Sequence, residues 1–178
     1  MSATGPVAAI RPENAGDASS IAQLLTDAFN GSNEAALVAA LRRDGDLLAS
    51  LVAERGATIV GHIAASPFAC LDPGPAVSAA ALAPLAVTER DRRQGIGGRL
   101  VQKLLADLQS CNIGLVFVLG DPDYYRRFGF APETAAAMRT PFDGPHQMAI
   151  ELAPGAARNA AGRRFAYAPA FAPFLPPA

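Results

Sequence analysis

The sequence is poor in several residue types that define whole classes of protein. Among 178 residues it has two cysteines, two histidines and a single lysine, Lys103, beside fourteen arginines. Cys70 and Cys111 fit neither a disulfide framework nor a metal-ligand cluster. Two distant histidines, His62 and His146, also make a poor metal site. The sequence therefore predicts no metal centre and no fold held together by disulfides.

The sequence also lacks long hydrophobic runs and an excess of one charge. No apolar run reaches the roughly 20 residues needed to span a membrane, and no positive segment followed by an apolar stretch opens the chain. The net charge of −1 disfavours a general nucleic-acid or membrane-surface binder, which is usually strongly basic. We therefore expect a soluble, cytoplasmic protein with no nucleic-acid or membrane partner.

The composition is that of one globular domain. Hydrophobic residues make up 51% of the chain and charged residues 17%, and a chain of this length can bury roughly 70% of its unfolded surface. There is no internal repeat and no dividing linker. We expect a single domain over residues 1–178, with a Pro-rich C-terminal end from about residue 169.

Periodicity and turn residues predict a mixed order of strands and helices. Strands are expected at 7–10, 47–54, 58–66, 77–87, 115–119, 146–152 and 163–168. Helices are expected from a cap at Asp17 or Ser19 to residue 29, then at 33–43, 95–110 and 121–128, with a small-residue loop at 153–162. Pro84 must interrupt its strand or mark a bulge. This order predicts an α/β or α+β domain with a mixed sheet.

The segment from Leu85 to Leu100 joins a strand to a helix through a glycine-bearing loop, Arg92-x-x-Gly95-x-Gly97. The first N–H groups of a helix lack partners within it, and the helix dipole favours an anion there. Glycines let that anion approach the backbone. Five basic residues lie between 88 and 103, against two acids: Arg90, Arg92, Arg93, Arg99 and Lys103. The segment therefore predicts a site for a small polyanion that carries phosphate.

The spacing of the loop disfavours two common phosphate-binding motifs. No Gly-Lys-Ser/Thr follows, so a Walker loop would lack its lysine and its metal-binding hydroxyl. Gly95-x-Gly97-Gly98 also has the wrong third spacing for a dinucleotide fingerprint. A kinase-like or nucleotide-binding function is therefore the weakest interpretation.

The loop instead resembles the acetyl-CoA loop of the GNAT N-acetyltransferase superfamily, in which Arg92, Gly95 and Gly97 fill the three defining positions. A second segment, Tyr124 to Phe130, is similar to the family's aromatic-Tyr-x-x-apolar-Gly-Phe element after the fifth strand. The fuller match from 119 to 130 resembles a subgroup of predicted bacterial acetyltransferases. Residues 82–87 and 167–171 are similar to the fourth strand and the C-terminal segment of that subgroup. The resemblance is strong from 82 to 130.

The resemblance implies a GNAT-type fold, with a mixed, splayed central sheet and flanking helices. In that fold the strands ending at Val87 and Leu119 run parallel and separate, and acetyl-CoA enters the gap. An acetyl group then passes directly to a primary amine in a ternary complex. Backbone groups of residues 85–87 would pair with the pantetheine arm, and amides from 93 to 98 would hold the pyrophosphate. The implied cofactor-binding residues are Leu85, Ala86, Val87, Arg92, Arg93, Gln94, Gly95, Ile96, Gly97, Gly98 and Arg99.

The resemblance also assigns catalytic roles. Tyr125 matches the family's general acid, which protonates the departing thiolate; its alternative is a packed aromatic whose hydroxyl bonds to backbone. Tyr124 is expected as packing or pocket wall. The N–H of Val87 is the expected donor to the developing oxyanion. The Gly61-His62 pair is frequent in the superfamily and usually structural.

A general base is not defined by the sequence. Some family members carry a glutamate on the fourth strand, but residues 79–83 here are alanines and a leucine. The other acids have no spacing argument, and a water relay is equally consistent. These acids are Glu34, Glu54, Asp72, Glu89 and Glu133.

Several alternatives for function stay open. The enzyme could use another acyl-CoA or another acceptor, or the chain could be a non-catalytic CoA-binding regulatory module. The expected acceptor lining, at 29–34, 68–72 and 130–142, holds several aromatic and few charged residues. That lining favours a small, partly apolar amine or a peptide end over a polycation. Homodimers are common among members of the superfamily, but the sequence does not establish one.

Overall fold

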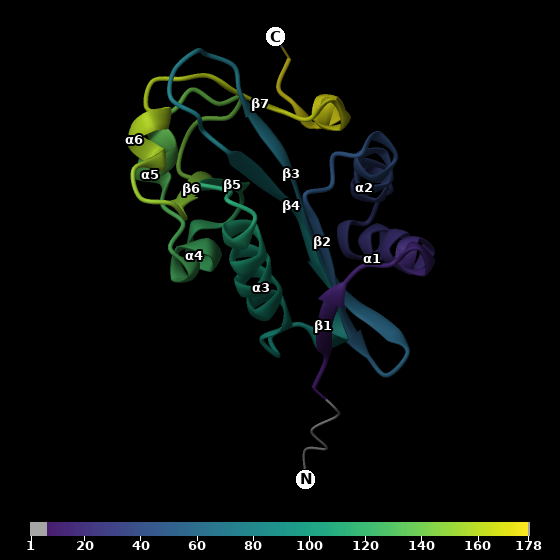
Figure 1. Ribbon diagram of the computed structural model, residues 1–178. Coiled ribbons are helices and arrows are strands. Elements are labelled where there is room, and N and C mark those ends of the chain that lie inside the picture. Colours follow the sequence, from purple (N-terminus) through teal and green to yellow (C-terminus); the bar gives the residue numbers. More distant parts are fainter. Residues whose placement is uncertain (1–6, 178) are drawn as a thin grey trace.

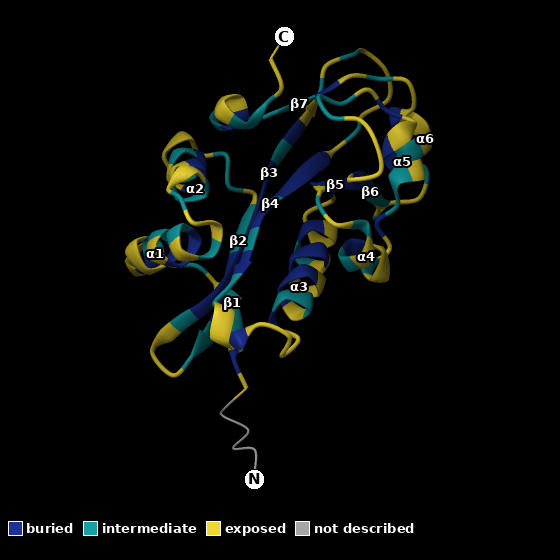
Figure 2. Cartoon of the chain, turned by 180° about the vertical axis from the view of Figure 1, so that it is seen from behind, coloured by how far each residue is buried: buried dark blue, intermediate teal, exposed yellow. Residues whose placement is uncertain are grey.

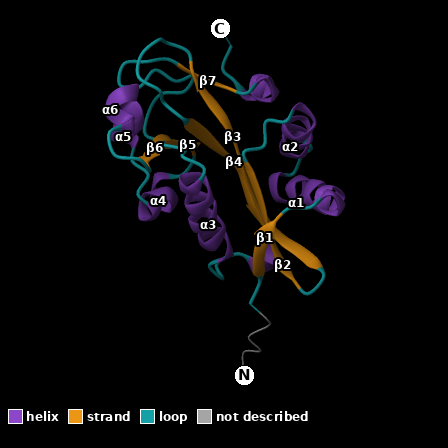
Figure 3. Ribbon diagram, viewed as in Figure 1, coloured by secondary structure: helices purple, strands orange, loops and turns teal. Residues whose placement is uncertain are grey.

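The computed structural model describes residues 7–177 and contains one seven-stranded mixed sheet. Its strands are β1 (Ala9–Pro12), β2 (Ala49–Arg55), β3 (Thr58–Cys70), β4 (Ala79–Val87), β5 (Leu115–Leu119), β6 (Gln147–Glu151) and β7 (Phe165–Tyr167). The helices are α1 (Ala18–Phe29), α2 (Asn33–Asp44), α3 (Ile96–Ser110), α4 (Pro122–Tyr125), α5 (Pro132–Ala136) and α6 (Ala156–Ala160). Six strands follow chain order across the sheet, and β7 pairs with the far end of β3 (Figures 1 and 3).

The predicted mixed α/β architecture is confirmed, with local corrections. The first strand lies two residues later than predicted, and β3 continues to Cys70. The predicted loop at 153–162 is wrong, because α6 forms there. Both carboxylate oxygens of Glu151 accept backbone N–H groups, from Gly155 and Ala157, at the start of this helix and so stabilise it. The short α5 was not predicted.

Two layers of helices cover the central strands. Helices α1 and α2 lie on one face of β2, β3 and β4, and α3 lies on the other (Figure 1). The apolar stripe of α3 packs against the sheet, and β3 and β4 are dark with burial along most of their length (Figure 2). None of the helices in residues 7–177 is both long enough and apolar enough to cross a bilayer.

Strands β4 and β5 are parallel, and they pair over only three residues. The register runs from Ala79 opposite Leu115 to Ala81 opposite Phe117. Beyond that point β4 continues to Val87 without β5 beside it. Leu85 pairs with Ile63 and Leu82 with Ala65, so Ala83 and Pro84 form a bulge opposite Ala64. The predicted interruption at Pro84 is confirmed, and such a bulge bends the strand. The two strands therefore separate at the middle of the sheet.

Gly61 on β3 lets α3 approach the sheet. A Cβ added there would lie 3.0 Å from Leu100 Cδ1, 3.2 Å from Ile96 Cγ2 and 3.3 Å from Ala53 Cβ. Ile96 opens α3 immediately after the glycine-bearing loop. The absence of a side chain at Gly61 therefore sets the position of that loop against the sheet.

The Pro-rich end of the chain packs on α2. After β7, the chain forms a 3₁₀ turn over Pro169–Phe174. Phe171 and Ala168 are buried in a cluster with Leu37 and Leu41 of α2. This segment covers an apolar face of α2 that would otherwise meet water.

We predict that Gly61→Val lowers the free energy of unfolding by about 1–3 kcal/mol, because the new side chain overfills the contact with α3. Urea denaturation measures this change. Gly31→Val is the matched control, because a Cβ at Gly31 meets nothing closer than the carbonyl oxygen of Phe29 at 4.0 Å. Equal stability of the two variants would contradict the role of Gly61.

Candidate functional site

The loop between β4 and α3 leaves its helix start open. A 3₁₀ turn at Glu89–Asp91 is followed by Arg93 and Gly95 in left-handed conformations, with φ of 59° and 79°. Gly95 is the N-cap of α3, and no side chain caps that end. The first N–H groups of the helix are therefore available to a ligand.

The buried side chain of Asp91 anchors this loop. Its side chain is 3% exposed and accepts hydrogen bonds from Arg55, Arg90 and the Thr88 hydroxyl. The Thr88 hydroxyl and the two arginines hold the pKa of Asp91 below its usual range. Arg55 also donates to the Gln94 Oε1 at 2.9 Å. No local sequence signal predicts this anchor, because Arg55 lies in the β2–β3 hairpin, 36 residues away.

A cavity of about 540 Å³ lies at this helix start. Its wall comprises Val87, residues 91–93 and 95–98, Tyr124 and Arg127. Three arginines, at 92, 93 and 127, contribute positive charge, whereas the carboxylate of Asp91 is already paired. The cavity therefore offers both backbone donors and net positive charge to an anion.

Gly97 provides room for Tyr124. A Cβ at Gly97 would lie only 2.6 Å from the Tyr124 hydroxyl oxygen. The guanidinium carbon of Arg127 lies 4.1 Å from the centroid of the Tyr124 ring, a cation–π distance. Arg127 was not among the wall residues predicted from the sequence. Arg127 follows Tyr124 by three residues, and this spacing places both on one face of a helix, which was the signal that could have predicted it.

The free edge of β4 presents backbone groups beside this cavity. The Thr88 N–H donates to the Val60 carbonyl at 2.9 Å, toward β3. Because backbone polar groups alternate between the two edges of a strand, Leu85 and Val87 direct theirs away from β3. The Val87 carbonyl accepts from Arg92 Nε at 3.3 Å. Ala86, by the same alternation, directs its polar groups toward β3.

Tyr125 packs just beyond the end of β5. It is 9% exposed, and its ring lies where a side chain on Gly120 would be, since a Cβ there would come 2.5 Å from Tyr125 Cε2. Phe130 meets the ring edge-on at 5.6 Å. Burial raises the pKa of Tyr125 above its ordinary value. Its hydroxyl makes no hydrogen bond to any residue from 7 to 177.

Two predicted cofactor-binding side chains point elsewhere. Arg99 donates to the Ala8 carbonyl at 2.9 Å and does not line the cavity. The amide of Gln94 donates to the Arg90 carbonyl at 3.1 Å, and its oxygen accepts from Arg55. Any contribution from Gln94 to anion binding would therefore come from its backbone.

The five acids considered as a general base lie in different parts of the structure. Glu54 is paired with Arg11, and Asp72 with Arg164. Glu133 is exposed on α5, and Glu89 lines a different cavity between the end of α1 and the loop. Glu34 alone among these five lines a cavity of about 300 Å³ at the separation of β4 and β5.

His62 belongs to a buried polar network. Its Nε2 lies 2.9 Å from the Ser50 hydroxyl, and both neighbour Glu13, which accepts two hydrogen bonds from Arg42. Burial lowers the pKa of His62. Within residues 7–177 no three histidine, cysteine or acidic side chains gather as a metal site. The arrangement is that of a structural network under α2.

Comparison with known proteins identifies the domain type. The model of the acetyltransferase (GNAT) domain family matches residues 9–132. The uncharacterized N-acetyltransferase YhbS of Escherichia coli K12 is 40% identical over 122 residues, which are 68% of this chain and 72% of that protein. A second E. coli protein, the uncharacterized N-acetyltransferase YjhQ, is 38% identical over 118 residues, 65% of each chain.

Two solved structures match this fold along nearly the full length of the chain. The crystal structure of E. coli YhbS in complex with CoA matches with a TM-score of 0.86 and 33% identity, over 96% of this chain and 95% of that chain. A GNAT family acetyltransferase from Brucella melitensis in complex with acetyl-CoA matches with a TM-score of 0.75 and 31% identity, over 92% and 97% of the two chains.

We predict that Asp91→Asn lowers the free energy of unfolding by about 1–3 kcal/mol near pH 7, since Arg55 loses its charged partner. Because the folded-state pKa of Asp91 is depressed, its contribution is present above the unfolded pKa of about 3.9 and is lost as the pH falls further. The variant should therefore lose less stability than the parent on acidification below about pH 4.

Urea denaturation of the parent and the Asp91→Asn variant at several pH values measures both the loss of stability near pH 7 and its dependence on pH. Asp107→Asn is the control, because Asp107 forms an exposed i,i+4 pair with Lys103, and such pairs contribute only about 0.3–0.5 kcal/mol. An Asp91→Asn variant with the stability of this control would contradict the anchoring role.

Proposed function

The chain belongs to the GNAT family of acetyltransferases, and we propose that it transfers an acetyl group from acetyl-CoA to a primary amine. The observation that carries this proposal is the pairing of two features across the β4–β5 gap. On one side an arginine-rich helix start can hold phosphates. On the other side an apolar cavity can hold an acceptor. The gap itself would admit the thioester between them.

The residues of the loop fit the CoA pyrophosphate. The uncapped start of α3 offers N–H groups from 96 to 98, and Arg92, Arg93 and Arg127 add charge around the same cavity. Gly97 keeps the approach free of a Cβ. The pantetheine arm would run along the open edge of β4, where Leu85 and Val87 present backbone donors and acceptors in the manner of an added strand. Acetyl-CoA supplies an activated thioester when bound.

Residues around the gap supply the chemistry. The amine nitrogen forms a bond to the thioester carbonyl carbon, and the oxygen that becomes negative accepts from the Leu85 N–H on the free edge of β4. Val87, the donor expected from the sequence, lines the cavity at the start of α3 instead. The carbon–sulfur bond then breaks, and Tyr125 gives its phenolic proton to the departing sulfur. The proton shed by the amine passes to water and restores Tyr125. A raised pKa keeps Tyr125 protonated, as an acid must be before it acts.

The acceptor must also lose a proton before it attacks. An amine with a pKa near 10.4 is neutral in only about one part in 10³ at pH 7. No carboxylate lies on β4 beside the gap, because residues 79–87 are all apolar. We propose that deprotonation proceeds through water.

The proposed partner is a small-molecule or peptide amine rather than nucleic acid or a membrane. The near-neutral net charge and the local confinement of the arginines support this. A cytoplasmic location is proposed on the same composition.

We predict that Gly97→Asp abolishes saturable binding of acetyl-CoA, with at least a roughly hundredfold loss of affinity. A carboxylate would face the pyrophosphate at close range, and the new Cβ would collide with Tyr124. Calorimetric titration of acetyl-CoA into the folded variant measures the loss.

Gly97→Asn is the matched control, because it adds nearly the same volume without the charge. A larger loss for aspartate than for asparagine supports an anion at this position. Parental affinity in a folded Gly97→Asp protein would overturn the loop assignment.

We predict that Tyr125→Phe lowers turnover by roughly 10²-fold or more, the usual worth of a positioned acid, while acetyl-CoA affinity stays within about twofold. Phenylalanine keeps the ring against Gly120 and Phe130 and removes only the hydroxyl. Steady-state release of free thiol measures turnover.

Tyr124→Phe removes the same atom from the neighbouring ring and is the matched control. It should retain most of its turnover. Loss of turnover in Tyr124→Phe with none in Tyr125→Phe would transfer the acid role to Tyr124.

A further inference from the structure

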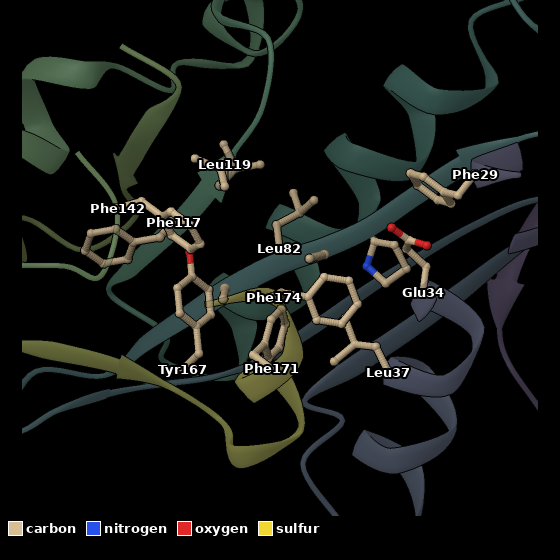
Figure 4. A pocket seen from close by; sticks show the side chains of 14 residues that line it. Phe29, Glu34, Leu37, Leu82, Phe117, Leu119, Phe142, Tyr167, Phe171 and Phe174 are labelled. Carbon is tan, nitrogen blue, oxygen red and sulfur yellow. The ribbon is translucent and has the colours of Figure 1, made fainter. Parts of the chain in front are cut away.

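The cavity beside the β4–β5 gap has an unusual lining for an amine site. It measures about 300 Å³, at the small end of ligand-binding cavities. Six aromatic side chains surround it, and they come from four separate parts of the chain (Figure 4): Phe29, Phe117, Phe142, Tyr167, Phe171 and Phe174. A space of this size and character suits one ring or a branched apolar group.

Among residues 7–177, Glu34 carries the only formal charge in this lining at neutral pH. The remaining polar side chain is Tyr167, and burial raises its pKa to about 12, so it stays neutral. Glu34 lies in the first turn of α2 and makes no hydrogen bond or ion pair with any other residue in the described part of the chain. Figure 4 shows its carboxylate at the same end of the cavity as the Phe29 ring.

The charge pattern discriminates among amines. A cation beside Glu34 gains a carboxylate partner, and the Phe29 ring lies at the same end of the cavity, where an aromatic ring can also attract an ammonium group. No arginine, lysine or histidine lines the cavity, so the carboxylate of an amino acid or the phosphate of a nucleotide would be buried unpaired. A second or third ammonium of a polyamine would likewise lack a partner, and peptide amides would lose hydrogen bonds to water.

We propose that the acceptor is a small aromatic monoamine, bound with its ring among these aromatic side chains and its ammonium group beside Glu34. This inference rests on the proposed function, because the same cavity opens where acetyl-CoA would reach the gap. Ala83 and Pro84 of β4 and Leu119 of β5 line it at the point where the strands part. The ring therefore sets the amine within the reach of the thioester.

The rim of the cavity supports entry of a free small molecule. Phe29 is 41% exposed and Leu119 is 45% exposed. Both belong to the lining, so apolar surface remains open to water at the mouth. An aromatic amine would cover part of this surface when it binds, which contributes to affinity.

The test compares acceptors under saturating acetyl-CoA, with thiol release as the readout. The panel is 2-phenylethylamine, phenylalanine, spermidine and a lysine-containing peptide. We expect kcat/KM for 2-phenylethylamine to exceed that of each other amine by about tenfold or more. A preference for spermidine, phenylalanine or the peptide would overturn the inference and leave acetyl transfer intact.

A pair of variants tests the assignment of Glu34. Glu34→Gln should raise KM for 2-phenylethylamine by about tenfold or more, the usual worth of a hydrogen bond to a charged group. Its inhibition by 2-phenylethanol, the uncharged analogue, should stay unchanged. Glu133→Gln is the matched control, because Glu133 lies in the first turn of α5 outside this cavity. Equal KM in both variants would overturn the role of Glu34.

A second pair tests the aromatic wall without disturbing the core. Phe29→Ala should raise the KM for 2-phenylethylamine and leave the affinity for acetyl-CoA unchanged. Leu48→Ala is its control, because Leu48 is 43% exposed and lies away from the cavity. An unaltered KM in Phe29→Ala would remove Phe29 from the acceptor site.

Binding measurements separate the two levels of proposal. Failure of the folded protein to bind acetyl-CoA would overturn the proposed function itself. If acetyl-CoA binds but no amine reacts, 2-phenylethylamine is titrated into the CoA-loaded protein. Saturable binding that Glu34→Gln weakens supports the inference, and the absence of such binding overturns it.

Discussion

The separation of β4 from β5 is the constraint on which the rest of this structure depends. The two strands pair over only three residues, from Ala79 opposite Leu115 to Ala81 opposite Phe117. A parallel pair that continued would satisfy the backbone groups of Leu85 and Val87 and would close the sheet. The bulge at Ala83 and Pro84 turns β4 away instead. The result is an open strand edge in the middle of a sheet, where a ligand can supply the missing hydrogen bonds.

The two cavities beside this gap differ in electrostatic character. The cavity at the start of α3 has three arginines and uncapped helical N–H groups. The cavity beside the ends of α1 and β5 has six aromatic side chains and one carboxylate. An anionic donor and a cationic acceptor would therefore each be directed to its own side. Gly61 and Asp91 fix the position of the first cavity relative to the gap. Gly61 allows α3 to pack closely on the sheet, and Asp91 holds the loop through its hydrogen bond from Arg55.

Glycines at the site make room for aromatic rings rather than for the ligand alone. A side chain on Gly97 would displace the Tyr124 hydroxyl, and one on Gly120 would displace the Tyr125 ring. The two adjacent tyrosines therefore depend on glycines from two different segments. One ring lies against the glycine-bearing loop, whereas the other lies past the end of β5. This division gives two residues that are neighbours in sequence different surroundings.

Much of this molecule could be predicted from the sequence by itself. Strand and helix order, the irregularity at Pro84, the glycine-bearing helix start and the aromatic segment after β5 all follow from local pattern. They follow because periodicity, turn chemistry and helix-end chemistry act over a few residues. Family resemblance then joined these local signals into one architecture. The helix at 156–160 was not predicted, because its first turn is stabilised by Glu151, a residue outside the segment.

Only the tertiary structure decided which side chains share a site. Arg127 rather than Arg99 lines the cavity at the start of α3, because Arg99 donates to the carbonyl of Ala8, the residue before β1. Five acids were equivalent in sequence, yet Glu54 and Asp72 are paired with arginines far along the chain, and Glu34 lines the aromatic cavity beside the β4–β5 gap. Such partnerships join residues tens of positions apart. Their distances are fixed by how elements pack in space, and no local spacing carries that information.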